Sequence, residues 1–303
     1  MKKFTKICLT ITAIVAALGI VLCGVSVVLG GSWEEAAKRM EETGIDGFMK
    51  DWFWDNAVYT NTLDAGKETC TDTFKVEEFN HIDIELDLAD VKVIKSEDAE
   101  NVKVTMKKGY LKHYSCELDG KTLEIEYDTG NHNYKSGPEI ILEIPDGIEL
   151  KKIEADTALG DITFEGLTLN INTLDVHSNL GNVKFTDMVM LCDIKAGTDL
   201  GDVKFLNGTY GKMNLENNLG DITITGEVTD DVKACCDMGD VKVELSGKES
   251  DYNYSLSTDM GDVEINDVDY NKEMSGEADI TNKGAEITLT LESDMGDVTV
   301  TTK

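Results

Sequence analysis

The sequence predicts an all-β protein, a parallel β-solenoid with rungs of about twenty residues that follows an N-terminal transmembrane helix. Two observations carry this prediction: a short phrase that recurs seven times, and an uncharged run of 25 residues near the N-terminus. A fixed period near twenty residues is typical of stacked supersecondary units, none of which buries its apolar face alone. Parallel crossovers are overwhelmingly right-handed, so we expect a right-handed β-helix.

The repeated phrase is a glycine with apolar residues at fixed places around it. The copies read LGDITF at 159–164, LGNVKF at 180–185, LGDVKF at 200–205, LGDITI at 219–224, MGDVKV at 238–243, MGDVEI at 260–265 and MGDVTV at 295–300. Two and four positions after the glycine the residue is β-branched or aromatic, with a polar residue between, which is the alternation of a strand. Each rung is therefore predicted to be a strand, a tight corner at the glycine and a second strand.

The columns upstream of the glycine extend the pattern. Seven positions before it the residue is apolar, three before it is small, and the residue directly before it is Leu or Met. We expect the apolar columns to stack on themselves inside the solenoid. The segment 85–94 fits the same columns with Ala89 in place of glycine, and is predicted to be a degenerate first rung, because terminal units of repeat arrays are atypical.

The N-terminal run at 7–31 is predicted to be a single-pass membrane anchor. As a helix it is roughly 37 Å long, enough to cross a bilayer. Lys2, Lys3 and Lys6 precede it, so the tail at 1–6 is expected in the cytoplasm and the C-terminal domain outside the cell. The alternatives are a cleaved signal peptide and a lipoprotein attached at Cys23, but the run is long and no A-x-A site follows it.

Four further segments complete the predicted organisation. Residues 32–57 hold all three tryptophans and are expected to lie against the membrane or to cap the solenoid, and 58–73 form a linker. Residues 74–150 are predicted to be an N-terminal β-cap with a hairpin at Asp119–Gly120, and 151–303 carry the repeats.

The charge of the chain limits its partners. The formal net charge is −31, and a surface this acidic repels nucleic acid and anionic lipid. Cationic peptides, metal ions, neutral glycans and other cell-envelope components remain as partners. Solubility alone would also explain such a charge.

Asp or Asn stands two before and one after each corner glycine, with Ala158 as the exception, and two explanations fit these residues. In-register carboxylates about 4.8 Å apart repel one another by about 1 kcal/mol in water. Either a cation such as Ca²⁺ relieves this repulsion, or each side chain caps the turn by accepting backbone N–H groups. Asn179, Asn182 and Asn218 would serve a cap as well as an aspartate and a metal less well. The candidate metal ligands are Asp199, Asp202, Asp221, Asp237, Asp240, Asp259, Asp262, Asp294 and Asp297.

No constellation in the sequence indicates catalysis, so no catalytic residue and no organic cofactor is predicted. The four histidines, His81, His113, His132 and His177, are scattered, and none lies beside a nucleophile motif. Polysaccharide lyases share the parallel β-helix but need basic residues, and Arg39 is the only arginine.

The repeats and the strands before them resemble a bacterial family of "putative adhesins", a β-strand-repeat domain of unknown function. The resemblance rests on FNHIDIELDLADVKVI at 79–94, EIILEIPDGIELKKIEADTALGDITFEG at 139–166 and the G-D-[IV] repeats, and covers roughly 74–303. It implies a β-helical stack on the cell envelope, mainly of Gram-positive bacteria. Some relatives act in envelope-stress responses, including the sensing of antimicrobial peptides, and no catalytic residues carry over.

The function expected from these observations is that of a membrane-anchored, extracytoplasmic β-solenoid. It would act without catalysis, as a binding or structural module in adhesion or in envelope-stress sensing. The alternatives are a calcium-dependent surface module and a glycan-active β-helix enzyme. A further reading makes the last strand, at 297–300, an uncovered edge on which copies of the chain polymerise.

Overall fold

A computed structural model describes residues 67–130, 136–272 and 275–303. The predicted tail, membrane anchor and juxtamembrane segment, and most of the linker, lie outside these residues. Within the described part, no helix is long and apolar enough to span a membrane. The described part is all-β, with two short 3-10 turns, η1 (Leu111–His113) and η2 (Glu249–Asp251).

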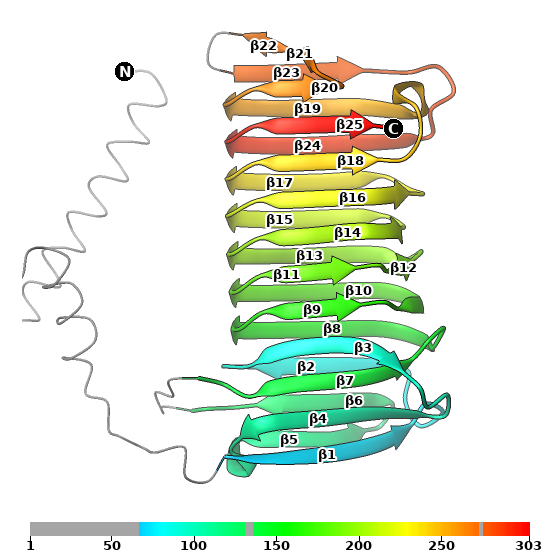
Figure 1. Cartoon of the computed structure of the whole chain (residues 1–303), viewed down its shortest axis with the longest axis vertical. Coiled ribbons are helices and arrows are strands. Elements are labelled where there is room, and N and C mark those ends of the chain that lie inside the picture. The colour runs from blue at the N-terminus through cyan, green and yellow to red at the C-terminus, as the bar shows by residue number, and fades with distance from the viewer. Residues whose placement is uncertain (1–66, 131–135, 273–274) are drawn as a thin grey trace, which may run out of the picture. The chain divides into compact units, whose positions relative to one another are not determined.

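The rungs of residues 67–303 stack as two parallel ladders of strands (Figure 1). The ladder that precedes each corner contains β2 (His81–Leu86), β6 (Thr122–Tyr127), β8 (Glu149–Leu159), β10 (Thr168–Leu180), β13 (Asp193–Leu200), β15 (Met213–Leu219), β17 (Val232–Met238), β19 (Tyr252–Met260) and β24 (Ile287–Met295). The ladder that follows it contains β3 (Asp90–Ser96), β7 (Glu139–Pro145), β9 (Ile162–Glu165), β11 (Val183–Thr186), β12 (Val189–Met190), β14 (Val203–Tyr210), β16 (Ile222–Val228), β18 (Val241–Leu245), β20 (Val263–Ile265) and β25 (Val298–Thr302).

Equivalent positions of neighbouring rungs pair in register. Leu180 is opposite both Leu159 and Leu200, and Val183 is opposite both Ile162 and Val203. The pairing confirms the predicted all-β stack of rungs. The right-handed crossover stays a prediction.

The rungs at the C-terminal end are not stacked in the order of the sequence. Strands β24 and β25 lie between the rung of β17 and β18 and the rung of β19 and β20 (Figure 1). Val298 is thus paired with Val241 on one side and with Val263 on the other. The prediction that 297–300 forms an uncovered edge is therefore wrong, because the chain turns back after β20 and fills the space beside β17.

The same exchange occurs at the N-terminal end. Strands β2 and β3, the predicted degenerate rung, lie between β6 and β7 on one side and β8 and β9 on the other. The columns of this rung are confirmed, since Ile82 is opposite Ile153 and Val91 is opposite Ile162. The prediction that this rung lies at the end of the stack is wrong, because the chain leaves β3, forms antiparallel strands farther out and returns as β6 and β7 on its outer side.

Antiparallel strands close both ends of the stack. At the N-terminal end these are β1 (Glu68–Lys75), β4 (Asn101–Gly109) and β5 (Tyr114–Asp119), and the β5–β6 hairpin confirms the turn predicted at Asp119–Gly120. At the other end they are β21 (Val268–Asp269), β22 (Asn271–Lys272) and β23 (Ser275–Ile280). Both edges of the parallel stack are therefore covered by antiparallel pairing, which limits edge-to-edge association.

The core between the ladders is built from the inward columns. The residues two and four positions after each glycine are buried, as are the apolar residues seven before it and the small residues three before it. Phe164 stacks on Phe185 with centroids 5.0 Å apart, Phe185 stacks on Phe205 at 4.4 Å, and Tyr210 meets Phe205 edge-on. Aromatic pairs of this kind add about 0.5–1.5 kcal/mol each beyond the area that they bury.

The apolar column directly before the glycine lies on the outside of the solenoid, whereas the sequence predicts it inside. Leu159, Leu180, Leu200, Leu219 and Met238, each directly before a corner glycine, are 36–45% exposed. The residue three before the glycine points inward, and the next two positions both face solvent, because the backbone turns away from the core as it enters the corner. Strand alternation therefore ends before the glycine, and these side chains lie outside.

Candidate functional site

Seven corners are built around a glycine that no other residue can replace without a clash, while Ala89 takes the equivalent position in the rung of β2 and β3. The φ angles of the corner glycines lie between +132° and +157°, a region that L side chains rarely adopt. A Cβ on Gly220 would lie 2.0 Å from the carbonyl oxygen of Gly201, and each of the other corner glycines meets the preceding corner in the same way. Close approach of the backbones therefore requires the glycine column.

The small column on the inner side of the corner satisfies the glycine carbonyls. Each of these buried side chains donates a hydrogen bond to the corner carbonyl of the neighbouring rung. The pairs are Thr157 to Ala89 (3.3 Å), Ser178 to Gly160 (2.9 Å), Thr198 to Gly181 (2.8 Å), Asn217 to Gly201 (3.0 Å), Cys236 to Gly220 (3.1 Å), Thr258 to Gly296 (2.8 Å) and Ser293 to Gly239 (2.9 Å). The requirement at this position is thus for a small donor that reaches one carbonyl.

Cys236 belongs to this column, and its free thiol is buried. Burial raises its pKa to about 12, so the group stays protonated and can donate to Gly220. A thiol with a raised pKa is a poor nucleophile, which fits a structural role.

The acidic column directly after the glycine is hydrogen-bonded from rung to rung. From Asp90 through Asp297, in the order of the stack, each Oδ1 accepts the backbone N–H of the equivalent residue in the next rung. The donor–acceptor pairs are Asp161 to Asp90 (2.9 Å), Asn182 to Asp161 (2.7 Å), Asp202 to Asn182 (2.9 Å), Asp221 to Asp202 (3.0 Å), Asp240 to Asp221 (2.9 Å), Asp297 to Asp240 (2.8 Å) and Asp262 to Asp297 (2.8 Å). Asn182 performs the same task with an amide oxygen, so the hydrogen bond does not require a carboxylate.

The aspartates two positions before the glycine lie on the other side of the corner. Asp199, Asp237, Asp259 and Asp294 are exposed, and Asp199 accepts a hydrogen bond of 2.9 Å from the amide of Asn218. In the described part of the chain, none of the nine candidate aspartates belongs to a group of three or more potential metal ligands with atoms within 4.8 Å of one another. Cation binding at the corner stays a prediction.

Asp202 shows how one of these carboxylates is stabilised in its charged form. Partial burial raises its pKa, but the ammonium of Lys204 at 2.6 Å and the N–H of Asp221 lower it by more. The net effect is a pKa below the usual range of an aspartate. The folded state therefore favours the ionised carboxylate.

The exposed apolar column and the acids beside it form a continuous surface along the stack, the corner ridge. Its apolar line pairs in register from strand to strand. Acidic or amide side chains flank it at the positions two before and one after each glycine, except at Ala158, two before Gly160. The apolar line consists of Leu159, Leu180, Leu200, Leu219, Met238, Met295 and Met260. The ridge thus offers apolar contact between two negatively charged borders.

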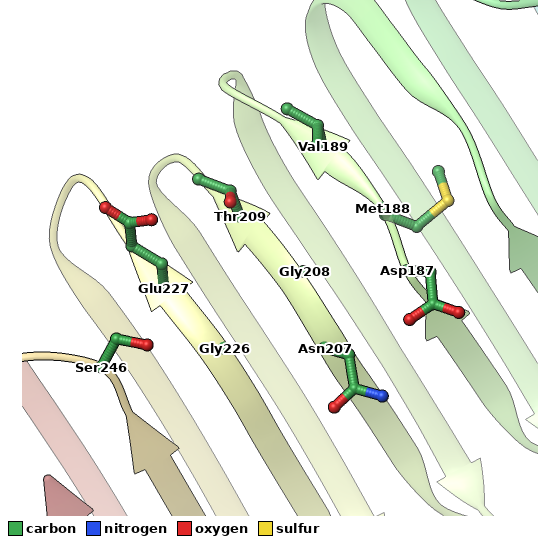
Figure 2. A pocket seen from close by; sticks show the side chains of 9 residues that line it. All are labelled: Asp187, Met188, Val189, Asn207, Gly208, Thr209, Gly226, Glu227 and Ser246. Atoms are coloured by element: carbon green, nitrogen blue, oxygen red, sulfur yellow. The ribbon is translucent and has the colours of Figure 1, made fainter. Parts of the chain in front are cut away.

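A shallow depression lies on the ladder that follows the corner, at the far end of its strands from the ridge (Figure 2). It is lined by Asp187, Met188, Val189, Asn207, Gly208, Thr209, Gly226, Glu227 and Ser246. The two carboxylates, of Asp187 and Glu227, lie at opposite ends and point away from one another in Figure 2. The lining contains no histidine, lysine or arginine.

The structure brings together one group of potential metal ligands from strands that are far apart in the sequence. His81 on β2 lies beside Asp83 and Glu154, with one potential ligand atom of each residue within 4.8 Å of the others. The i, i+2 spacing of His81 and Asp83 on a strand is the only signal in the sequence, while Glu154 arrives through the pairing of β2 with β8. His132 lies outside the described residues.

A comparison with known protein families finds a match over most of the repeats. The sequence matches the family model described as Toastrack DUF4097 at residues 79–234 and again at 142–301. No curated protein matches it.

Several solved structures are similar over 78% of this chain at low identity. A "putative adhesin" from Bacteroides fragilis is 16% identical, with 98% of that chain covered and a TM-score of 0.42. A "putative cell adhesion protein" from Clostridium sporogenes is 14% identical, with 100% covered and a TM-score of 0.37. A "putative lipid binding protein" from Parabacteroides distasonis is 14% identical, with 97% covered and a TM-score of 0.27.

Proposed function

This chain belongs to the Toastrack DUF4097 family, and from that membership together with the corner ridge we propose that it is a non-enzymatic binding module of the cell surface. The ridge is the contact surface, and its ligand is a cationic amphipathic peptide. Residues 7–31 anchor the module in the cell membrane in a single pass, with the tail inside and the repeats outside. Adhesion and envelope-stress sensing are both roles for such a module.

The single observation that supports this function is the exposed apolar line of the corner ridge. Soluble proteins rarely leave contiguous apolar side chains exposed without a partner. Here Leu200 and Leu219 are 45% and 36% exposed, and they are paired in register on adjacent strands. A binding surface explains why Leu or Met recurs at a position that the core does not use.

Charge complementarity supports a cationic ligand. The net charge of the chain is −31, and Asp or Asn flanks the apolar line on both sides except at Ala158. Rungs repeat about every 4.8 Å, and the apolar face of an α-helix repeats about every 5.4 Å. A basic amphipathic helix lying along the stack would therefore meet an apolar side chain at each of several successive rungs, with its lysines or arginines over the aspartates.

A non-enzymatic role is also supported by the depression on the other side of the stack. Its hydroxyl groups, from Thr209 and Ser246, have no histidine or lysine beside them in the lining, and its two carboxylates, of Asp187 and Glu227, point away from one another in Figure 2. Arg39, the only arginine, precedes the repeats by more than a hundred residues, so none of the described rungs carries the guanidinium that would hold an acidic sugar.

Peptide binding can be measured directly. Fluorescence anisotropy of a labelled cationic amphipathic helix is recorded against the full-length chain in detergent, with the double variant Leu200→Ser, Leu219→Ser. Removing two leucines from an apolar contact should weaken binding at least ~10-fold. Leu191→Ser is the matched control, because Leu191 is 63% exposed but lies outside the ridge. Equal affinity of the double variant and the wild-type chain would rule out the ridge.

A further inference from the structure

His81, Asp83 and Glu154 lie on the outer face of the ladder that precedes the corner, on the adjacent parallel strands β2 and β8. The register places Asp83 opposite Glu154 and His81 opposite Lys152. Because alternate residues of a strand share a face, all four side chains point to the same side of the ladder. The potential ligand atoms of His81, Asp83 and Glu154 lie within 4.8 Å of one another.

The imidazole of His81 is oriented toward this group. Its Nε2 lies 2.8 Å from Oε2 of Glu154, and it is shielded from solvent without a hydrogen bond of acceptable geometry. Its Nδ1 lies 3.4 Å from the hydroxyl of Thr122 on β6. A histidine that binds a metal through one nitrogen is commonly held by a hydrogen bond at the other.

The two carboxylate oxygens of Glu154 have different neighbours, one of which is Lys152. Its ammonium contacts Oε1, while Oε2 faces His81. The lysine balances the carboxylate charge when no cation is bound, and it leaves one carboxylate oxygen directed at the imidazole. Lys152 is therefore a competitor of any cation at this position.

The strands on either side add negative charge around the group. Glu124 of β6 is opposite Asp83, and Asp175 of β10 is opposite Glu154. Carboxylates on four adjacent strands thus lie in one row, and two lysines contact it: Lys152 of β8 at Glu154, and Lys195 of β13 at Asp175. Such a row raises the local concentration of cations.

We propose that His81, Asp83 and Glu154 bind a divalent transition metal ion of the zinc class. One imidazole nitrogen and two carboxylate oxygens are donors that Zn²⁺ accepts, and water would complete a tetrahedral shell. Ca²⁺ and Mg²⁺ prefer all-oxygen ligands, so the imidazole selects against them. The site is separate from the aspartates of the corner, which provide no nitrogen ligand.

Co²⁺ titration of the full-length chain under reducing conditions tests the proposal, because Co²⁺ substitutes for Zn²⁺ and is visible spectroscopically. One ion should bind per wild-type chain, through nitrogen and oxygen. Loss of a ligand in His81→Gln should weaken binding roughly 100-fold or more. His177→Gln is the matched control. His177 lies on β10, on the same outer face of the ladder as His81, and is absent from the ligand group.

Two further variants make the result decisive. Asp83→Asn should weaken binding as His81→Gln does, and Lys152→Gln should strengthen it by removing the competing ammonium. Thermal melts in EDTA show whether each variant is folded. The proposal is overturned if His81→Gln and Asp83→Asn bind Co²⁺ as the wild-type chain does, if the wild-type chain binds none, or if thiolate charge-transfer bands show that cysteines hold the ion.

Discussion

The carbonyl oxygen of Gly201 lies 2.0 Å from the position that a Cβ on Gly220 would occupy. The two residues belong to adjacent corners, and Asn217 donates a hydrogen bond to the same carbonyl from inside. The carbonyl of Gly201 therefore has Gly220 on one side and the Asn217 amide on the other. A side chain at position 220 would displace this carbonyl, so only glycine is compatible with the hydrogen bond. Corner spacing, glycine and the small inner column are one structural unit.

Gly220→Ala should destabilise the protein strongly. The new Cβ meets backbone that cannot move without shifting the next rung, and φ at this residue is +132°. We expect a loss of about 3 kcal/mol or more in the free energy of unfolding, measured by urea denaturation. Gly120→Ala is the control, because φ there is +61° and nothing lies within 4 Å of its Cβ. The control should lose only about 1 kcal/mol, and equal losses would contradict the steric explanation.

Thr198→Val should also destabilise the protein, through an unsatisfied carbonyl. The hydroxyl of Thr198 donates to Gly181 at 2.8 Å inside the corner, and valine has a similar shape without the donor. A buried acceptor left without its partner costs about 1–3 kcal/mol, which urea denaturation detects. Thr198→Ser keeps the hydroxyl and should lose less than the valine variant. The explanation fails if serine is the more damaging change.

A thermal melt distinguishes the two explanations for the corner aspartates, turn capping and cation binding. Because their Oδ1 atoms already accept backbone N–H groups, we expect the same melting temperature with about 1 mM Ca²⁺ as with EDTA, whereas a saturated site would add a few kcal/mol. A rise with Ca²⁺ that disappears in Asp240→Asn, Asp262→Asn would instead make the corner a cation site and support a calcium-dependent module. Mg²⁺ in place of Ca²⁺ serves as the control for ionic strength.

Acid should remove the contribution of Asp202 to stability. Its pKa is lower in the folded protein than in the unfolded chain, so the unfolded chain takes up the proton first as the pH falls. The stability that wild type has over Asp202→Asn is therefore complete above the ordinary aspartate pKa of about 3.9 and declines as the pH passes below it toward the folded value. Urea midpoints of both proteins at a series of pH values measure this difference. A difference that grows on acidification would contradict the assigned direction.

The columns of the solenoid could be predicted from the sequence because equivalent positions of neighbouring rungs pair with one another. Val183 lies beside Ile162 and Val203, so one alternation repeated at one spacing specifies strand, corner and inward face. The hairpin at Asp119–Gly120 was predictable for a different reason, the local turn chemistry of Asp-Gly. Both are short-range or self-repeating signals.

The order of the rungs could not be predicted in this way. Val263 and Val298 occupy the same column, and either would fit beside Val241. The repeat specifies which positions pair and leaves open which copies are neighbours. In the structure the antiparallel strand β23 covers the outer side of β19, which lies at the end of its ladder.

The face of Leu200 and its equivalents and the group around His81 were missed for two further reasons. An apolar residue next to a turn was assigned inward by alternation, although the corner breaks that alternation. His81 meets Glu154 across a gap of more than seventy residues, through a pairing that the exchanged rung order creates. Long-range register was the missing information in that case.

The insertion of β24 and β25 has a consequence for how the chain folds as it is made. During synthesis β19 and β20 emerge first, while the strands that they pair with in the finished stack are still absent. If β19 docked at once on β17, it would occupy the place that β24 takes in the end. The C-terminal rungs must therefore wait or rearrange, so this part of the stack is completed by a late, nonlocal step in place of growth one rung at a time.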